Sequence, residues 1–357
     1  MDLLARNPEI LICWSAGRLL VENLRKSERT FVSVETVLLL DVFKRPRSAE
    51  AAARALSEFD RSSVLRSIRQ LVKLGLLIPA KEARRRASRI AAWRENLASA
   101  YYHVAARDIV FMRSPAAIER SLRALVARER QPQHFKRYPG KPRRKLPARS
   151  AGDSGHSLES VLAARRTVRD FSRRPVSFDD LAAVVSGTWG RTGWLDGGPL
   201  GPLPLKTSPS AGSRHPGEMY VLAWNVAGLS PGLYHYEVAS DELRQLKSGD
   251  LRTAAVEAAS GQAWVRGAAF LCVMTVIFER TLWKYELENA YRVVWLDAGH
   301  LAQTFCLLAT SRGLGPFTTA AIQDTFLEKL IGLDGIREFP VYLCGAGVPE
   351  KNALPDG

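Results

Sequence analysis

Two stretches of the chain carry residue types that can together hold a phosphate group and a flat polar ring. The first, RRTVRDF at residues 165–171, places three arginines and a hydroxyl at the end of a predicted helix. The second, SPSAGSRHP at residues 208–216, is a loop of small residues, rich in backbone N–H donors, that leads into a predicted strand. Arginine binds phosphate as a forked, permanently charged group, and small residues let the backbone approach a planar ligand closely. The pair suits a cofactor such as flavin mononucleotide (FMN).

Each stretch alone also has an ordinary structural explanation. An arginine-rich helix end is commonly a solvated surface, and a loop of Ser, Gly and Pro is commonly a turn. The occurrence of both stretches in this order, followed by the segments described below, favours a binding site.

The net charge of the chain, +15, is spread unevenly. Residues 1–150 hold 32 of the 51 Lys and Arg but only 14 of the 36 Asp and Glu, which gives them a net charge of +18, whereas residues 151–357 have a net charge of −3. The basic half is suited to nucleic acid, an acidic peptide or an acidic protein. The near-neutral half has the charge balance of an ordinary enzyme domain, and the 46% hydrophobic content of the 357 residues is sufficient for a real core.

Cysteine usage and hydropathy narrow the class of protein further. The cysteines are widely spaced, lie in apolar surroundings and form no CxxC pair, so we expect no metal site, no disulfide framework and a cytoplasmic location. They are Cys13, Cys272, Cys306 and Cys344. The longest apolar run, 267–278, is too short to cross a bilayer. We also expect no signal peptide, because the first residues lack a long apolar core.

Residues 1–80 are predicted to form a winged-helix-like domain that binds a peptide or a partner. Partial alternation over 5–21 predicts a pair of strands, and helices are predicted over 33–43, 47–56 and 60–74. The last helix has the clearest apolar face and ends at Gly75, after which 76–78 is a predicted strand. Three helices followed by a strand is the order of a winged helix.

Residues 81–150 are predicted to be a basic helical segment followed by a linker. The helical part extends to about residue 130. Between 131 and 148 there are four prolines among many Lys and Arg, a composition typical of linkers. We place the domain boundary near Ser150.

Residues 151–357 alternate predicted helices and strands, which indicates an α/β domain. Helices are predicted over 158–167, after the capping box that begins at Ser177, over 251–260 and over 282–313. Strands are predicted over 219–224, 232–236, 267–278 and 339–344. The glycine- and proline-rich stretch 187–205 is a predicted loop that could act as a lid.

This half resembles the nitroreductase family of flavoproteins and, more narrowly, its SagB-type members, the dehydrogenases of azole-containing ribosomal peptides. The resemblance covers roughly residues 155–350. It implies an α+β sandwich with a mixed sheet flanked by helices, FMN as cofactor, and a homodimer with the flavin at the subunit interface. The motifs, in order, are RRTVRDF (165–171), SPSAGSRHPGEMY (208–220), GLYHYE (232–237), WKYELENAYRVVWLDAGH (283–300), SRGLG (311–315) and GLDG with EFPVYLCGAG (332–347).

The resemblance also implies which residues contact the flavin. Contacts from the helix end to the phosphate and ring are implied for Arg165, Arg166, Thr167 and Arg169. The loop along the isoalloxazine corresponds to Ser208, Pro209, Ser210, Ala211 and Gly212. The turn near the far side of the ring corresponds to Gly313, Leu314 and Gly315. Residues 318–321 follow where further contacts are expected, but PFTTAA (316–321) departs from the family's Gly-Ala-Phe-like turn, and Lys351 is the candidate for a basic phosphate ligand near the C-terminus.

Lys284 and Tyr285 match the Lys-Tyr pair that SagB-type enzymes need for azoline oxidation. Aromatising an azoline removes a hydride, which goes to the flavin, and a proton from a neighbouring carbon. A desolvated lysine can act as a neutral base, and a tyrosine can relay or orient the proton. The alternative is a surface lysine in the first turn of a helix. His215 and His300 also lie inside matched motifs, with a structural role as their alternative.

The N-terminal half corresponds to the part of SagB-type enzymes that carries winged-helix modules. Those modules bind a leader peptide by adding it as a strand, which implies a precursor peptide as substrate and a cyclodehydratase as partner. The alternative is a DNA-binding winged helix in which Arg61, Arg66, Arg69 and Lys73 face phosphates. A basic stripe beside an oxidoreductase favours a peptide or protein over nucleic acid, and no membrane partner is expected.

Three functions remain open at this point. The first is an FMN-dependent peptide dehydrogenase that converts thiazolines or oxazolines to azoles, with oxygen reoxidising the flavin. The second is an NAD(P)H-dependent nitroreductase or dehydrogenase of small molecules. The third is a flavin-free scaffold that binds peptide or DNA, against which the arginines at 165, 166 and 169 argue.

Overall fold

The computed structural model describes residues 3–108, 112, 114–147, 155–285 and 288–350. The chain divides into two compact units, Met1–Phe111 and Met112–Gly357. Each unit has its own core and is described by itself.

The N-terminal unit combines short antiparallel strands with helices. Strands β2, β3 and β4 form one sheet in that order, and β1 pairs with β5. Its elements are β1 (Leu4–Arg6), β2 (Ile10–Ser15), β3 (Arg18–Asn23), β4 (Glu28–Phe31), α1 (Val34–Val42), α2 (Ala49–Ala55), α3 (Arg61–Lys73), β5 (Leu77–Pro79), α4 (Ala80–Ala91) and α5 (Leu97–Ala105).

Helix α3 shows why the predicted helices form where they do. The Asp60 side chain caps it by accepting a hydrogen bond from the backbone N–H of Ser63 at 2.8 Å. Its apolar face, which includes Val64 and Ile68, is buried in a core shared with α1 and α2. The three helices and the following strand lie where the sequence predicts them, and the winged-helix classification stays a prediction.

The C-terminal unit contains one large sheet and most of the helices. Its elements are α6 (Pro115–Arg128), β6 (Arg143–Lys145), α7 (Leu158–Ala164), β7 (Val176–Ser177), α8 (Phe178–Trp189), β8 (Arg191–Asp196), η1 (Gly198–Leu200), β9 (Pro202–Lys206), η2 (Ala211–Ser213), β10 (Gly217–Ala223), β11 (Val226–Ala227), β12 (Gly232–Glu237), β13 (Glu242–Ser248), α9 (Arg252–Ala258), η3 (Ala263–Gly267), β14 (Phe270–Ile277), α10 (Glu279–Leu282), α11 (Asn289–Ser311), β15 (Gly315–Thr319), α12 (Asp324–Ile331) and β16 (Glu338–Gly347).

The large sheet has seven strands in the order β15-β16-β14-β10-β12-β13-β6. Among the residues that the structure describes, every neighbouring pair in this sheet is antiparallel, whereas we expected mixed pairing. The parallel pairing that is present lies outside it, between β7 and β11. Short connections explain the difference, because β10, β12 and β13 follow one another closely and a parallel pair needs a long crossover.

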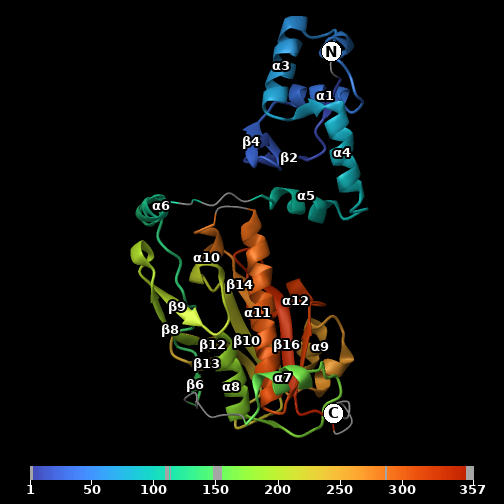
Figure 1. The fold of residues 1–357 in the computed structure, drawn as a ribbon. Helices are drawn as coiled ribbons and strands as arrows, with labels where there is room; N and C mark the ends of the chain where they lie inside the picture. Colours follow the sequence, from blue (N-terminus) through green and yellow to red (C-terminus); the bar gives the residue numbers. More distant parts are fainter. Residues whose placement is uncertain (1–2, 109–111, 113, 148–154, 286–287, 351–357) are drawn as a thin grey trace. The chain divides into compact units, whose positions relative to one another are not determined.

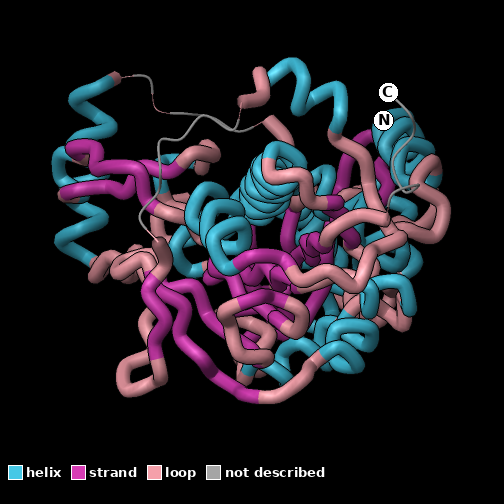
Figure 2. Tube along the Cα trace, turned by 90° about the horizontal axis from the view of Figure 1, so that it is seen from below, coloured by secondary structure: helices cyan, strands magenta, loops and turns pink. Residues whose placement is uncertain are grey.

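Helices cover both faces of this sheet. Side chains that alternate along each strand pack against α8 and α11 on one face and against α9, η3 and α12 on the other. Figure 1 shows α11 running along the sheet, and Figure 2 shows the strands of this unit enclosed between helices. Strand β14 is almost entirely apolar for this reason, since neither of its faces meets water.

The stretch expected to be a linker instead packs against the large sheet. Strand β6 is its edge strand, and Leu146 is buried in its core. The ammonium group of Lys136 forms an ion pair with Glu338 at 2.5 Å and donates to the hydroxyl of Tyr220 at 2.8 Å. Prolines and surface cations indicated a linker, but these long-range contacts stabilise an ordered path.

Two further local predictions are corrected by the structure. The stretch predicted to be a lid loop contains the antiparallel hairpin β8–β9. The helix predicted over 282–313 is divided into α10 and α11, so Lys284 and Tyr285 follow α10 rather than lying in the first turn of a long helix.

All four cysteines are free thiols, and Cys272, Cys306 and Cys344 are buried in the C-terminal unit. Burial raises the pKa of all three thiols, that of Cys306 to about 11. Within the described part of the chain, no helix combines the length and apolar character needed to cross a membrane.

Replacing Lys136 by Met tests whether residues 131–147 belong to the fold. The carboxylate of Glu338 would keep the hydroxyls of Tyr220 and Thr275 as donors but lose its cation. We expect the free energy of unfolding to fall by about 2 kcal/mol. This is less than for a fully buried pair, because the side chains of Lys136 and Glu338 are 25% and 10% exposed. Urea unfolding measures it. The exposed Lys141, in the same stretch, is the control, and equal effects of Lys136→Met and Lys141→Met would contradict the prediction.

Candidate functional site

The loop between β9 and β10 holds three residues in the left-handed backbone region. The φ angles are 58° at Gly212, 54° at Ser213 and 44° at His215. Left-handed backbone costs roughly 1–2 kcal/mol for a residue other than glycine. Such strain persists only where the surroundings enforce it, and it is concentrated at functional sites.

Side-chain hydrogen bonds hold this loop in place. The hydroxyl of Ser210 donates to the Asp297 carboxylate on α11 at 2.5 Å and accepts from the backbone N–H of His215 at 2.9 Å. The imidazole Nε2 of His215 donates to the carbonyl of Pro204 at 3.0 Å, and the Ser213 hydroxyl donates to the same carbonyl at 2.5 Å. The loop is therefore fixed both to α11 and to β9.

Lys284 and Tyr285 lie directly against Gly212. A Cβ atom at Gly212 would lie 2.6 Å from Nζ of Lys284 and 2.5 Å from the hydroxyl oxygen of Tyr285. Glycine is therefore required both by the backbone angle and by the space. The structure thus brings the predicted Lys-Tyr pair and the predicted loop of small residues to one place.

The electrostatic surroundings favour the neutral form of Lys284. Burial lowers its pKa, and the positive charge of Arg214 lowers it further. Burial likewise raises the pKa of Tyr285, which keeps the phenol protonated. The pKa of Lys284 is thus shifted in the direction that a general base needs, and Tyr285 keeps its proton as a hydrogen-bond donor.

Arg214 is fully buried beside this pair. Its Nε donates to the carbonyl of Arg280 at 3.0 Å, and its guanidinium lies 5.0 Å from the centre of the Trp283 ring. Its Nη2 has no hydrogen-bond partner among the described residues. Burial and the charge of Arg280 lower the pKa of Arg214 to about 10, so it is a cation at neutral pH and raises the local potential.

A buried set of charged groups lies beneath the loop. Nη1 of Arg280 forms an ion pair with the Glu218 carboxylate at 2.7 Å. The same carboxylate is hydrogen-bonded to Nε2 of His235 at 2.7 Å. Lys206 lines a small pocket with Ser208, Ser210 and Asp297, and burial lowers its pKa to about 8. Burial raises the pKa of Asp297, an effect that its hydrogen bond from Ser210 opposes.

A second group of predicted residues gathers around the end of α7 and the start of β15. The backbone N–H of Val168 donates to the carbonyl of Pro316 at 3.0 Å. A Cβ atom at Gly315 would lie 2.7 Å from the Cβ of Val168, so glycine permits this close approach. The segment 165–169 and the turn 313–315 are therefore neighbours.

The predicted arginines differ in what they contact. Arg166 donates twice from Nη1, to the carbonyls of Ala163 and Arg165 at 2.8 Å each, and so satisfies the exposed end of α7. The guanidinium of Arg169 lies 5.4 Å from the centre of the Trp264 ring. Arg165 is half-buried, and its charge acts on the Cys306 thiol of α11.

Both groups are placed along α11. Figure 1 shows α10 near the beginning of α11 and α7 near its other end. Asp297, which holds the 208–216 loop, precedes Cys306 by nine residues, or about 14 Å of helix. The loop also reaches further along α11, because the Ser208 hydroxyl is hydrogen-bonded at 2.7 Å to that of Thr304, two residues before Cys306. One chain brings Ser208–Gly212 to Lys284 and Tyr285, and Arg165–Arg169 to 313–315, and no hydrogen bond among the described residues joins the two groups directly.

The remaining candidates have structural roles or lie elsewhere. His215 bonds a backbone carbonyl as described, and burial lowers its pKa to about 3, which keeps it neutral. His300 is exposed on α11. Thr318 accepts a hydrogen bond from the hydroxyl of Tyr342 at 3.0 Å. Lys351 lies outside the described residues. In the described part of the chain there is no cluster of three or more His, Cys, Asp or Glu side chains suited to a metal ion.

Sequence reasoning missed three residues of the site: Lys206, Arg214 and Asp297. Asp297 carried a usable signal, because it is an acid on an otherwise apolar face of the predicted helix, between Val294 and Leu301. Arg214 lies inside a matched motif but its burial is a tertiary property. Lys206 precedes the loop by two residues and had no signal of its own.

Known proteins resemble this chain most over the C-terminal unit. The model of the nitroreductase family matches residues 162–348, more than half of the chain. A nitroreductase-like protein of Methanocaldococcus jannaschii is 30% identical over 190 residues, which cover 53% of this chain and 90% of the relative. The microcin B17-processing protein McbC of Escherichia coli is 28% identical over 131 residues, or 35% of this chain and 48% of that protein.

Similarity to relatives also extends beyond that unit. The trifolitoxin-processing protein TfxB of Rhizobium leguminosarum bv. trifolii is 24% identical over 308 residues, which cover 83% of each chain. An alignment of this extent reaches into the N-terminal unit, since Met112–Gly357 makes up less than 83% of the chain.

A solved structure shows the same fold. It is a nitroreductase-like protein from Anabaena variabilis, with a TM-score of 0.50 and 23% identity. The match covers 60% of this chain and 44% of that one. The expected α/β fold of the C-terminal unit, with a sheet flanked by helices, is confirmed.

Lys284 should lose its proton at a lower pH than an exposed lysine, because burial and the charge of Arg214 both disfavour the ammonium form. Acylation of the protein at a series of pH values, followed by peptide mass spectrometry, measures this, with the exposed Lys329 as reference. In Arg214→Leu the profile of Lys284 should move to higher pH. The prediction is wrong if Lys284 and Lys329 are acylated with the same pH dependence. It is also wrong if the pH dependence of Lys284 is unchanged in an Arg214→Leu protein with a normal melting temperature.

Proposed function

The chain belongs to the nitroreductase family, a family of oxidoreductases, and we propose that it is an FMN-dependent dehydrogenase of the SagB type that oxidises thiazoline or oxazoline rings of a ribosomally made peptide to azoles. The observation that carries the proposal is the Lys284–Tyr285 pair, held against Gly212 in the loop of small residues. The relatives named for processing trifolitoxin and microcin B17 support a role in maturing such a product.

The residues present fit FMN. Family members typically bind this flavin. The small residues of 208–212 would let the backbone approach a planar ring closely, with Lys284 and Tyr285 held beside it at Gly212. The phosphate would be held by Arg165 and Thr167, which stay accessible, whereas Arg166 is used by the end of its own helix. The ring would lie along Ser208–Gly212 and near Gly313–Gly315.

The chemistry divides between cofactor and protein. FMN, when bound, would supply the acceptor for the hydride that leaves the azoline ring, and dioxygen would take up the two electrons. Lys284, in its neutral form, removes the proton from the neighbouring ring carbon at Nζ. Tyr285 keeps its own proton and orients the reacting ring through its hydroxyl. The buried cation of Arg214 favours the neutral form of Lys284 before the reaction.

A homodimer would complete this site. Within one chain no hydrogen bond among the described residues joins Arg165–Arg169 to the 208–216 loop, and a second copy would bring Arg165 of one subunit to that loop of the other. Apolar side chains are exposed on α7 and α11, as expected of a surface covered by a partner. They include Leu158, Leu162, Trp295 and Leu296, which are 61%, 48%, 42% and 56% exposed.

The N-terminal unit would bind the leader part of the precursor peptide. Strand β4 lies at an edge of the sheet β2-β3-β4, so an extended peptide can add to it as a further strand. The excess of cations in the N-terminal half suits an acidic leader or a cyclodehydratase partner.

Substitution of Lys284 tests the proposed base. With an azoline peptide as substrate, Lys284→Ala should lower the rate by at least about 100-fold, the usual contribution of a general base, and Tyr285→Phe by about tenfold. The rate of the parent protein should fall as the pH drops through the pKa of Lys284, since only the neutral amine accepts a proton. The FMN content of each variant is the control. A fully active Lys284→Ala, or NAD(P)H oxidation with a nitro compound but no turnover of any azoline peptide, would reject the proposal.

Mixing two inactive variants tests the shared site. Arg165→Ala and Lys284→Ala are each expected to be inactive as homodimers. In a mixed dimer, one of the two sites would receive an unaltered Arg165 from one subunit and an unaltered Lys284 from the other. Unfolding and refolding the two variants together should therefore restore activity. If each site lies within one subunit, every site keeps a defect and no activity returns.

A further inference from the structure

A second cavity lies on the other side of the large sheet from Lys284 and Gly212. Its volume is about 780 Å³, within the range of small-molecule sites. It is formed by residues 169–173, the end of β10, the start of α9 and the turn η3. Because η3 and α9 cover the face opposite to α8 and α11, this cavity is separate from the 208–216 loop.

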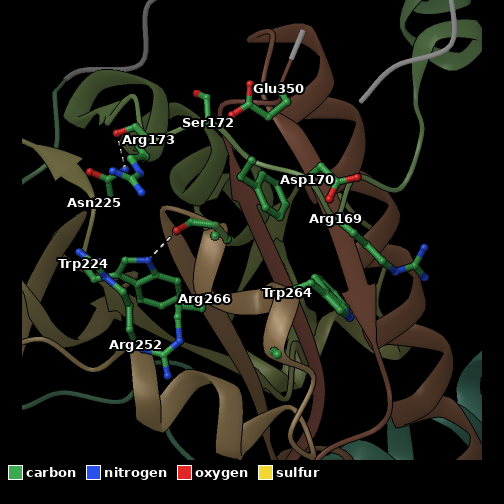
Figure 3. Close-up of a pocket in the computed structure, with 14 residues that line it drawn as sticks. Arg169, Asp170, Ser172, Arg173, Trp224, Asn225, Arg252, Trp264, Arg266 and Glu350 are labelled. Carbon is green, nitrogen blue, oxygen red and sulfur yellow. Dashed lines mark hydrogen bonds between the residues drawn. The ribbon is translucent and has the colours of Figure 1, made fainter. Parts of the chain in front are cut away.

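Arginine dominates the lining of this cavity. Arg173, Arg252 and Arg266 come from three separate segments, and Figure 3 shows their side chains around the hollow. Arg252 has a partner in Asp250 at 3.4 Å. Neither Arg173 nor Arg266 forms an ion pair with any residue that the structure describes. In Figure 3 the guanidinium of Arg169 extends past Trp264, away from this group, so it is not needed for the argument.

Two tryptophans provide firm aromatic walls. Trp224 is only 6% exposed, and its indole N–H donates to the carbonyl of Ala268 at 2.5 Å. Trp264 packs edge-on against Phe317, with ring centres 4.6 Å apart. Both rings are therefore fixed before any ligand arrives, which reduces the entropy lost on binding.

Two carboxylates, those of Asp170 and Glu350, complete the lining. Figure 3 shows both near the rim, apart from Arg252 and Arg266. Carboxylates at such positions accept hydrogen bonds from sugar hydroxyls in nucleotide sites. The cavity thus offers cations, flat apolar surfaces and hydrogen-bond acceptors in different places.

We propose that this cavity binds a nucleotide of about the size of a nucleoside diphosphate. The arginines would bind the phosphates through paired hydrogen bonds, and the indole rings would stack on the base. The rim carboxylates would accept hydrogen bonds from the sugar hydroxyls. An acidic peptide would use the arginines alone, and its carboxylates would be repelled by Asp170 and Glu350. The proposal does not depend on the azoline activity, because no residue of the Lys284 site takes part.

Calorimetric titration of the full-length protein, saturated with FMN, tests the assignment with ADP as probe. Adenosine, inorganic phosphate and a hexaglutamate peptide are the comparison ligands. Arg173→Ala and Arg266→Ala should each weaken ADP binding by about tenfold, the effect of losing one charge-assisted hydrogen bond. Arg174→Ala is the matched control, because Arg174 is the next residue along the chain and does not line the cavity. Thermal unfolding checks that every variant is folded.

The outcomes separate the alternatives. Binding of ADP that exceeds that of adenosine and phosphate, and that weakens in Arg173→Ala and Arg266→Ala but not in Arg174→Ala, supports the proposal. The proposal is overturned if hexaglutamate binds more strongly than ADP or if ADP releases FMN. It is also overturned if all three substitutions have equal effects, or if millimolar ADP gives no heat of binding. Because the azoline assay is not used, failure here leaves the proposed dehydrogenase activity to its own test.

Discussion

The arrangement of the candidate active site depends on one buried guanidinium, that of Arg280. It pairs with Glu218 on β10, donates from Nε to the carbonyl of Gln133 at 2.8 Å, and approaches the carbonyl of His215 at 3.4 Å. Its own backbone carbonyl receives Arg214. Three segments far apart in sequence, at residues 133, 214–218 and 280, are thus joined at one cation with 2% exposure. Removing one partner of such a pair typically costs 3–5 kcal/mol, because the other charge stays buried.

This dependence explains why the strained loop keeps its shape. Ser213 and His215 adopt left-handed backbone only because β9, α11 and Arg280 hold the loop on different sides. The same fixation places Gly212 under Lys284, so the close approach is present before any ligand binds. A site held in this way loses little entropy when a planar molecule enters it.

Local features of the sequence predicted local structure well. The cap at Ser177, the apolar face of α3 and the apolar strand β14 all have short-range signals, and each element lies where it was expected. The structure also brings Lys284 and Tyr285 to Gly212, which lies in a separate motif, while their roles stay a prediction. The contacts that the sequence could not indicate are long-range: Lys136 meets Glu338 across 202 positions, and Asp297 meets Ser210 across 87. Such contacts also stabilise the path of residues 131–147.

If dioxygen takes up the electrons, as the proposed function has it, the burial of the cysteines has a chemical consequence. That reaction releases hydrogen peroxide next to the protein that produces it, and peroxide attacks thiolates rather than thiols. Cys272 and Cys344 face each other across β14 and β16 in the interior of the sheet, and their raised pKa values keep both protonated. The core of the catalytic unit would therefore tolerate its own by-product through many turnovers, without a repair system acting on these positions.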